Sequence, residues 1–323
     1  MYFITGGAGF IGSNIAASLA EWDKPLVIAD TLGCGDKWRN IAELPLEAIV
    51  PPDGILDFLN EHKKSVTAIL HMGAISSTTE KDADLIIHTN FTLSQQLWNF
   101  CAQNAVPFIY ASSAATYGGG EHGFDDEFSA EYLAKLRPLN AYGWSKHLFD
   151  RWALTQTERG NTPPQWAGLK FFNVYGPNEH HKDSQASVVS HIYPLAKENK
   201  TCRLFKSCNP KYEDGGQLRD FVWVGDCANI TLWLLKNPHV SGLFNAGSGE
   251  ARSFYDLAKS VYTALGKGPK IEYIDMPENL REKYQYYTKA NQEKLKKTGY
   301  SLPATKLEDG VGMYVRDYLE KGN

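Results

Sequence analysis

The sequence has no long apolar run, although 43% of its 323 residues are hydrophobic. A helix that crosses a membrane needs about 20 consecutive apolar residues, so we expect no transmembrane segment and no membrane partner. The stretch from Met1 to Thr5 also lacks the basic segment and the apolar region that begin a secretory signal peptide. These absences predict a protein of the cytoplasm.

Strong charge of one sign is also missing. The 33 Lys and Arg residues nearly balance the 37 Asp and Glu residues and leave a formal net charge of −4. Proteins that bind nucleic acids through electrostatic attraction usually carry an excess of basic residues. We therefore expect no nucleic-acid partner.

Cysteine is scarce, and its spacing shows no pattern. Five cysteines are scattered along the chain without a C-x-x-C pair, which is typical of reduced thiols in a cytosolic enzyme rather than of disulfides or structural zinc. The adjacent histidines His180 and His181 cannot easily converge on one ion. The sequence therefore predicts no metal site. Internal repeats are also missing, and 323 residues suffice for two lobes.

A glycine-rich stretch near the start of the chain carries the first positive signal. Gly7, Gly9 and Gly12 fit the spacing G-x-G-x-x-G, and Gly6, Gly9 and Gly12 fit the related spacing G-x-x-G-x-x-G. A short apolar run typical of a buried strand precedes the glycines, and residues 14–20 place apolar side chains at helical spacing. Such a turn between a strand and a helix binds the pyrophosphate of a dinucleotide.

An acidic residue follows at the distance that this kind of site requires. The second expected strand ends at Asp30, about twenty residues beyond the glycines, where a carboxylate commonly binds the adenosine ribose. A carboxylate repels a 2′-phosphate and so favours NAD. Lys37 and Arg39 follow in a polar loop and are able to neutralise such a phosphate. The spacing alone leaves NAD and NADP open.

A third signal indicates redox chemistry at an alcohol carbon. The expected strand at residues 106–111 ends in two serines, the second of which is Ser113. Tyr142 and Lys146 follow on an expected helix, where residues four apart share a face. A lysine ammonium near a phenol lowers the phenol pKa from its ordinary value of about 10. We therefore expect Tyr142 to act as an acid and base near neutral pH.

The order of the expected elements predicts the fold. Strands and helices alternate through the first half of the chain, which predicts an α/β fold with a Rossmann-type doubly wound parallel sheet. Further strands are expected at residues 168–175, at 219–224, where the chain returns to the sheet, and at 242–249 with its turn. A helix is expected from Leu307 to Leu319. The sheet domain therefore takes segments from both halves of the chain, and a smaller domain interleaves with it.

Four motifs in this order resemble those of the extended short-chain dehydrogenase/reductases, a family of nucleotide-sugar epimerases, dehydratases and reductases. They are TGGAGFIG at residues 5–12, ASSAATYG at 111–118, NAYGWSK at 140–146 and FFNVYGP at 171–177. Further stretches resemble the branch of this family that epimerises an ADP-bound heptose for lipopolysaccharide synthesis. They are SSTTE at residues 76–80, SSAATYGG at 112–119 and HKDSQAS at 181–187.

The resemblance implies a division of the chain and a set of catalytic residues. The dinucleotide-binding domain is expected at residues 1–173 and 220–248, and the sugar-nucleotide-binding domain at residues 174–219 and 249–323. Ser113 is expected to bind the reacting oxygen and Tyr142 to transfer its proton. Lys146 is expected to anchor the nicotinamide ribose and to tune Tyr142. Lys182 is expected to be a second acid and base.

The resemblance also implies NADP as the cofactor, with Lys37 as a partner of its phosphate. Residues 48–53 hold no basic side chain for that phosphate, so NAD stays possible. The expected cofactor-binding residues are Gly6, Gly9, Phe10, Ile11, Gly12, Asp30, Thr31, Lys37, Met72, Gly73, Ala74, Ile75, Ser76, Asn90, Tyr142, Lys146, Val174 and Lys182. The expected substrate-binding residues are Ser113, Asn173, Ser184, His191, Phe205, Arg219 and Tyr284.

The reaction that the resemblance implies is the interconversion of ADP-D-glycero- and ADP-L-glycero-D-manno-heptose at C6″. It would proceed by transient oxidation and return of the hydride to the other face. A UDP-hexose 4-epimerase and a 4,6-dehydratase are alternatives, although Ala114 and Ala115 stand where a dehydratase typically has an acidic pair. A non-catalytic dinucleotide sensor is a remote alternative. Since members of the family associate, we expect a homo-oligomer.

Overall fold

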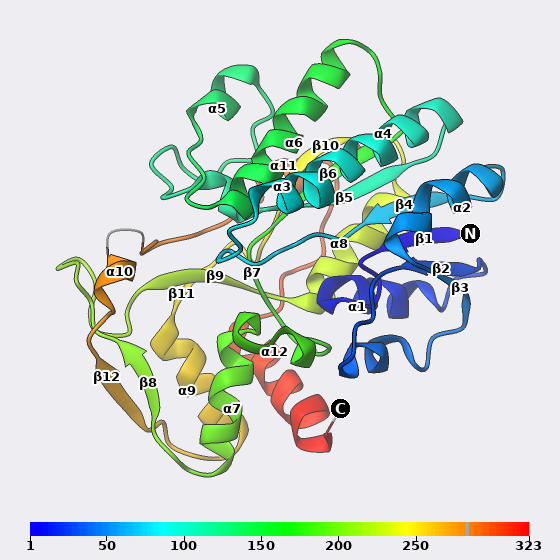
Figure 1. Cartoon of the computed structure of the whole chain (residues 1–323). Coiled ribbons are helices and arrows are strands. Elements are labelled where there is room, and N and C mark those ends of the chain that lie inside the picture. Colours follow the sequence, from blue (N-terminus) through cyan, green and yellow to red (C-terminus); the bar gives the residue numbers. More distant parts are fainter. Residues whose placement is uncertain (282–283, 323) are drawn as a thin grey trace.

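A parallel sheet forms the centre of the computed structural model, which describes residues 1–281 and 284–322. The sheet has seven strands in the order β10-β6-β5-β4-β1-β2-β3 (Figure 1). All of its strands except the largely exposed edge strand β3 are almost continuously buried, as expected when both faces of a sheet are covered. The strands are β1 (Tyr2–Thr5), β2 (Leu26–Ala29), β3 (Leu46–Val50), β4 (Ala68–His71), β5 (Phe108–Ser113), β6 (Trp166–Phe171) and β10 (Gly242–Ala246). All neighbouring pairs are parallel, which confirms the predicted fold class.

Helices cover both faces of this sheet (Figure 1). α1 packs against α8 on one face, and α6 packs against α3 on the other. A wider π-helical turn, Ile87–Thr92, joins α3 to α4. The helices of this part are α1 (Phe10–Leu19), α2 (Ile55–Glu61), α3 (Ala83–Ile86), α4 (Leu93–Asn104), α5 (Ala130–Lys135), α6 (Ala141–Glu158) and α8 (Val224–Lys236).

The smaller part of the molecule has its own strands, helices and hydrophobic core (Figure 1, lower left). Its first sheet has the order β11-β9-β7, and its second sheet pairs β12 with β8. The strands are β7 (Asn173–Tyr175), β8 (Cys202–Phe205), β9 (Leu218–Trp223), β11 (Ala251–Ser253) and β12 (Ile271–Ile274). The helices are α7 (Val188–Lys197), α9 (Phe254–Ala264), α10 (Glu278–Arg281) and α12 (Leu307–Met313). Helix α11 (Glu293–Lys297) comes late in the chain but packs against β10 of the main sheet, where Leu295 joins the main core (Figure 1).

One expected strand lies in a different sheet. Residues 219–224 were expected to return to the main sheet, but β9 pairs with β7 and β11 instead. The reason is that β6 already has β5 on one side and β10 on the other. The expected C-terminal helix begins at Leu307, and it continues after α12 as a π-helical turn, Tyr314–Tyr318. The predicted domain boundaries stay a prediction.

Three other expectations concern composition. In the part of the chain that the structure describes, no helix is both long and apolar enough to span a bilayer. All five cysteines are unpaired, and three of them are buried. Across the described ranges, His, Cys, Asp and Glu side chains also do not gather in groups of three or more that are able to hold a metal ion.

Candidate active site

The glycine-rich turn joins β1 to α1 and lies against the turn that follows β4. Gly6 has a φ of +64°, and a Cβ atom there would lie 2.5 Å from the Cα atom of Gly73. A Cβ atom on Gly12 would lie 2.2 Å from the carbonyl oxygen of Gly6. Both positions therefore need glycine. Helix α1 begins at Phe10 without a side-chain cap, so its first N–H groups remain available to an anion.

Asp30 lies beside this turn, after the end of β2. Its Oδ2 atom accepts a hydrogen bond from the Ala8 N–H at 2.9 Å, and its Oδ1 atom accepts one from the Thr31 N–H at 2.8 Å. The Lys37 ammonium also donates to Oδ1 at 2.6 Å. Asp30 and Lys37 therefore form an ion pair, which offsets the negative charge that would repel a 2′-phosphate. The glycine turn and this pair together fit the pyrophosphate and ribose of a dinucleotide.

Ser113, Tyr142 and Lys146 come together where β5 ends against α6, and we call this group the Tyr142 wall. The side chains of Ser113 and Tyr142 lie near each other, and their interaction lowers the pKa of the phenol. A Cβ atom on Gly143 would lie 2.8 Å from the carbonyl oxygen of Ala115, so glycine lets α6 approach the turn that follows Ser113. Lys146 lies one helical turn after Tyr142 and is only 3% exposed.

The pKa of Tyr142 differs from the expectation. Burial raises the pKa of the Tyr142 phenol above its ordinary value, and the interaction with Ser113 opposes this shift only in part. Burial also lowers the pKa of Lys146 to about 8. The predicted lowering of the Tyr142 pKa is therefore wrong for the chain on its own, because burial has the largest effect on the phenol and raises its pKa.

A buried asparagine supports the Tyr142 wall from behind. Asn90 accepts a hydrogen bond from the Ile75 N–H at 2.8 Å and donates to the Ile75 carbonyl at 2.9 Å. It also donates to the Ser145 hydroxyl at 3.0 Å, and Ser145 donates to the Tyr142 carbonyl at 2.7 Å. Asn90 thus ties the loop after β4 to helix α6. It is fully buried, so its contact with the cofactor stays a prediction.

His71, at the end of β4, is a packed residue. Its ring nitrogens pair with the Thr5 hydroxyl at 2.6 Å and with the Ser94 hydroxyl at 2.9 Å. Burial lowers the pKa of His71 to about 3, so the ring is neutral at physiological pH. The Gly73 N–H donates to the same Thr5 oxygen at 3.1 Å. His71 therefore helps to hold the β4 turn beside the glycine-rich turn.

The other wall of the site is the segment at residues 177–185, which we call the strap. The side chain of Asn14 donates to the first carbonyl of the strap at 3.1 Å. Asn178 donates from its side chain to the Ser13 hydroxyl at 3.0 Å, and its carbonyl accepts from Asn40 at 3.2 Å. These bonds tie the strap to α1 and to the polar turn that carries Lys37 and Asn40.

Lys182 lies in a 3₁₀ turn of the strap, with its ammonium 5.5 Å from the centre of the Phe10 ring. Burial lowers the pKa of Lys182, and the Glu179 carboxylate opposes this shift. Glu179 is buried and accepts hydrogen bonds from the Ser187 N–H and hydroxyl at 2.5 and 2.6 Å. The residue after Lys182, Asp183, has a φ of +46°, a left-handed conformation that favours glycine.

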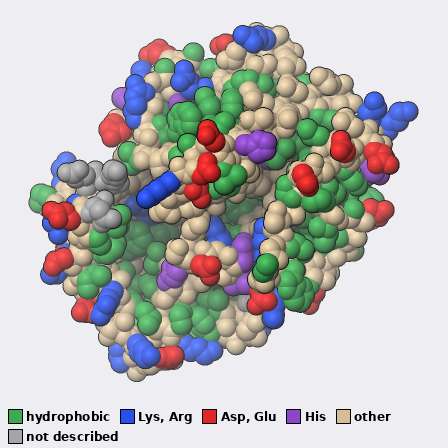
Figure 2. All heavy atoms as spheres, viewed as in Figure 1, with side chains coloured by type: hydrophobic (Ala, Val, Ile, Leu, Met, Phe, Trp, Pro, Cys, Tyr) green, Lys and Arg blue, Asp and Glu red, His purple; other side chains and the backbone are tan. Residues whose placement is uncertain are grey.

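One cavity of about 810 Å³ joins the glycine turn, the Tyr142 wall and the strap. Figure 2 shows a hollow between the two parts of the molecule with Lys, Arg and His side chains along it. Tyr142 and Lys182 line the same space from two different elements. The predicted residues that line it are Gly6, Gly9, Phe10, Ile11, Gly12, Asp30, Lys37, Met72, Gly73, Ala74, Ser76, Ser113, Tyr142, Lys146, Val174, Lys182 and Ser184.

Three predicted substrate residues form a separate cluster. The Arg219 guanidinium lies 5.3 Å from the centre of the Tyr284 ring, and the rings of Tyr284 and Phe205 are 6.4 Å apart. Within the described residues no carboxylate pairs with Arg219, which is 8% exposed. The neighbouring Asp220 accepts hydrogen bonds from the N–H groups of Ser248 and other loop residues instead. A buried guanidinium without a counter-ion suits an anionic ligand.

Other predicted residues lie outside the cavity lining. Thr31 and Ile75 act through their backbones, on Asp30 and Asn90. Asn173 on β7 and His191 on α7 are exposed. The roles predicted for these residues stay predictions.

Comparison with known proteins identifies the family. A family model described as "NAD dependent epimerase/dehydratase family" matches residues 2–247. Two proteins named ADP-L-glycero-D-manno-heptose-6-epimerase, from Nitratidesulfovibrio vulgaris strain DP4 and Fusobacterium nucleatum, are each 46% identical to this chain. The two alignments each cover 99% of this chain and 98% of the relative. The chain belongs to the NAD dependent epimerase/dehydratase family.

Solved structures share the fold. The crystal structure of Helicobacter pylori ADP-L-glycero-D-manno-heptose-6-epimerase matches with a TM-score of 0.81 and 28% identity, over 98% of this chain and 95% of that chain. The Thermus thermophilus UDP-glucose 4-epimerase in complex with NAD matches with a TM-score of 0.79 at 24% identity, over 100% of this chain and 99% of that chain. Family membership confirms the predicted epimerase class and a nicotinamide dinucleotide as cofactor.

Several residues that line the cavity of this chain were not predicted. Thr78, Thr79, Phe171, Phe172, His181 and Gln185 also line the cavity. All of them lie inside motifs that also carry predicted residues, so membership of these motifs was the signal that could have identified them. Glu179 was missed because its role depends on Ser187 and on the fold of the strap. Two buried charges behind the Tyr142 wall, Asp150 and Lys170, were also missed.

Proposed function

We propose that this chain is an ADP-glyceromanno-heptose 6-epimerase that interconverts the D-glycero and L-glycero forms at C6″. The single observation that carries the proposal is that Tyr142 and Lys182, two proton-transfer groups, line one cavity from different elements. Inversion without net oxidation needs acid and base chemistry on both faces of one carbon. The names of the relatives at 46% identity support the substrate.

The chain's own residues supply the positioning and the proton transfers. A nicotinamide dinucleotide bound along the glycine turn and Asp30 would supply a reversible acceptor for the hydride of the sugar carbon. Tyr142 removes the proton of the reacting hydroxyl, and the Ser113 hydroxyl holds the same oxygen. Lys182 performs the equivalent proton transfer on the opposite face. The buried ammonium of Lys146 lies one turn from Tyr142, where it favours the phenolate during the reaction.

We propose NADP as the cofactor, with Lys37 as the partner of its 2′-phosphate. The support is the ion pair with Asp30, which offsets the carboxylate that would otherwise disfavour this phosphate. Lys37→Ala should reduce retention of NADP by about 10-fold or more, since one charge-assisted contact is lost. Retention of NAD should change less. Equal losses for both dinucleotides would contradict the role of Lys37.

We propose that the diphosphate of the substrate binds at Arg219. The support is a buried guanidinium that lies over the rings of Tyr284 and Phe254 at 5.3 and 5.6 Å and has no carboxylate partner in the described part of the chain. Phe205 and Tyr284 then offer rings beside the nucleotide. Ser184, Asn173 and His191 complete the proposed substrate contacts. Self-association and a place in the cytoplasm also remain proposals.

The test is to incubate the purified protein with ADP-D-glycero-β-D-manno-heptose and to follow the configuration at C6″ by NMR. The bound dinucleotide is released from the same sample and identified. Inversion without added cofactor supports the epimerase and decides between NADP and NAD. Turnover of UDP-galactose instead would indicate a 4-epimerase. A bound dinucleotide without turnover of either sugar would overturn the proposal.

A further inference from the structure

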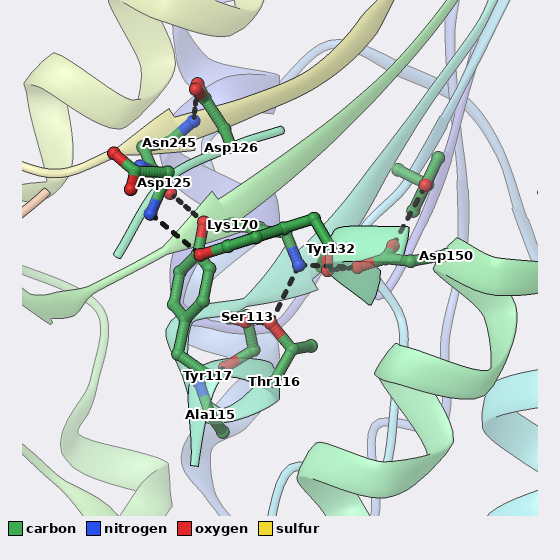
Figure 3. Close-up of polar contacts among 12 residues, drawn as sticks. Ser113, Ala115, Thr116, Tyr117, Asp125, Asp126, Tyr132, Asp150, Lys170 and Asn245 are labelled. Carbon is green, nitrogen blue, oxygen red and sulfur yellow. Dashed lines mark hydrogen bonds and ion pairs between the residues drawn. The ribbon is translucent and has the colours of Figure 1, made fainter. Parts of the chain in front are cut away.

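An ion pair buried behind the Tyr142 wall has no part in the reaction described so far. The Lys170 ammonium on β6 lies 2.7 Å from the Asp150 carboxylate on α6, and both side chains are 0% exposed (Figure 3). An ion pair removed from water contributes little to stability unless further hydrogen bonds satisfy its remaining atoms. The partners of this pair therefore indicate what it does.

Lys170 is bonded to the turn that carries Ser113. Its ammonium donates to the Thr116 hydroxyl at 2.7 Å, and Thr116 in turn donates to the Ser113 carbonyl at 2.8 Å (Figure 3). The same ammonium lies 4.9 Å from the centre of the Tyr117 ring. The Lys170 ammonium therefore contacts two residues, Thr116 and Tyr117, of the 3₁₀ turn Ala114–Tyr117 that follows β5.

Asp150 is bonded to the end of β5. Its Oδ2 atom accepts a hydrogen bond from the Ser112 hydroxyl at 2.8 Å, in addition to the one from Lys170. Its Oδ1 atom accepts one from the Tyr110 hydroxyl at 3.0 Å. Because residues four apart share a face of a helix, Asp150 lies one turn beyond Lys146 on α6. One carboxylate therefore connects the strand of Ser113 with the helix of Lys146.

We propose that Asp150 and Lys170 are positioning residues that hold Ser113 and Lys146 in a fixed relation within the active site. The proposal rests on the proposed function, in which Ser113 and Lys146 serve one proton transfer at Tyr142. The pair spans β6, β5 and α6, so a shift of any of these elements breaks at least one of its hydrogen bonds.

The charge of Asp150 supports this role. Burial lowers the pKa of Lys146 to about 8, and the Asp150 carboxylate opposes that shift. The other titratable groups near Lys146 are Tyr142 on the same helix and His71 on β4, whose pKa the Lys146 charge lowers. His71 is neutral and Tyr142 is a neutral phenol at rest, so Asp150 is the anion that raises the pKa of Lys146 against the effect of burial.

The test compares Asp150→Asn, Lys170→Met and the double variant, which contains no unpaired buried charge. Melting temperature, bound dinucleotide, and kcat and KM for the ADP-heptose are measured as functions of pH. We expect kcat to fall about 10- to 100-fold in all three with a small change in KM, because misplacement of catalytic groups has effects of this size. In Asp150→Asn and the double variant, the alkaline limb of the kcat profile should move to lower pH.

The control is Asp226→Asn, which removes a buried carboxylate on α8 that accepts hydrogen bonds from Thr305 at 2.8 and 2.9 Å. It should lower the melting temperature without moving the pH profile. A double variant with wild-type kcat and an unchanged pH profile would overturn the proposal, because the pair would then be only structural.

A second measurement is independent of the substrate. NMR of labelled lysine side chains, with the Lys146 signal assigned through Lys146→Arg, reports the titration of Lys146 directly. Lys146 should lose its proton at lower pH in Asp150→Asn than in the wild type, and an unchanged titration would overturn the proposal. If the wild-type protein does not epimerise the ADP-heptose, the proposed function fails while this titration still tests the role of Asp150.

Discussion

The two walls of the cavity are built in opposite ways. The Tyr142 wall lies on the 18-residue helix α6 and is bonded from behind through Ser145 and Asn90. The strap that carries Lys182 has only a short 3₁₀ turn, which contains a left-handed Asp183. One wall is part of the packed interior around the main sheet, whereas the other is a connecting segment that is bonded to α1 and to the turn at residues 36–41.

Under the proposed function, the site therefore combines one proton-transfer group on a long helix with a second group on a strap that is bonded to α1 and to the turn after β2. The strap leaves the smaller part of the molecule but is bonded to Asn14 on α1 and to Asn40 after β2. Lys182 therefore takes its position from the same elements that are expected to bind the dinucleotide. We expect the strap to be more sensitive than α6 to loss of the cofactor.

The largest effect on the rate is expected when Tyr142 loses its hydroxyl. Tyr142→Phe should lower kcat by about 10³-fold, because a positioned acid and base contributes 10²- to 10⁴-fold. The melting temperature and the bound dinucleotide should stay close to the wild type. NMR of the C6″ configuration measures the rate, and Tyr193→Phe on α7 is the matched control. Epimerisation near the wild-type rate would remove Tyr142 from the mechanism.

The second prediction removes the group on the strap. Lys182→Met should lower kcat by about 10²-fold, since one of two proton transfers loses its acid and base. Lys200→Met, an exposed lysine beyond α7, should have no effect on the same assay. If Lys182→Met alone left the rate unchanged, the two walls would not share the chemistry.

A smaller effect on the rate is expected from a change at Glu179, which affects the pKa of Lys182 in the strap. Its carboxylate raises the pKa of Lys182 against the lowering caused by burial. In Glu179→Gln this support is lost, so Lys182 should lose its proton at a lower pH. The alkaline limb of the kcat profile should move to lower pH, with a change of less than about 10-fold at neutral pH. A shift to higher pH would contradict the assigned direction.

The smallest expected effect concerns the left-handed residue of the strap. Asp183→Gly should raise the free energy of unfolding by about 1 kcal/mol, because glycine adopts this conformation without strain. The melting temperature should rise by about 2 °C. Asp183→Ala keeps the strain and serves as the control. Thermal unfolding followed by circular dichroism distinguishes the two, and equal melting temperatures would show that the strap stores no strain here.

The sequence carried the features that depend on local spacing. The glycines lie between a strand and a helix, so the dinucleotide turn could be predicted. Ser113 lies at a strand end, and Tyr142 and Lys146 lie on one helix face, so it could also be predicted that these three residues come together. The contacts that fix them could not, because they join distant segments. Asp150 meets Lys170, and Asn14 meets the carbonyl of Pro177, through the packing of whole elements.

The predicted lowering of the Tyr142 pKa was wrong for a related reason. The charge of Lys146 follows from the sequence, but the loss of water around Tyr142 follows only from the packing of α6 against the turn after β5. The prediction that β9 joins the main sheet was wrong because the sequence does not show that β10 occupies the free edge of β6. Both errors concern tertiary packing that a local pattern does not contain.

The position of β10 has a consequence for synthesis on the ribosome. The edge of β6 is completed only when residues 242–246 have emerged, after β7, α7, β8, β9 and α8, which lie between the two strands in the chain. Until then an apolar strand presents unpaired N–H and C=O groups, which recruit strands from other chains. Nascent chains stalled before Gly242 should therefore bind chaperones that recognise exposed strands, and complete chains should be released from them.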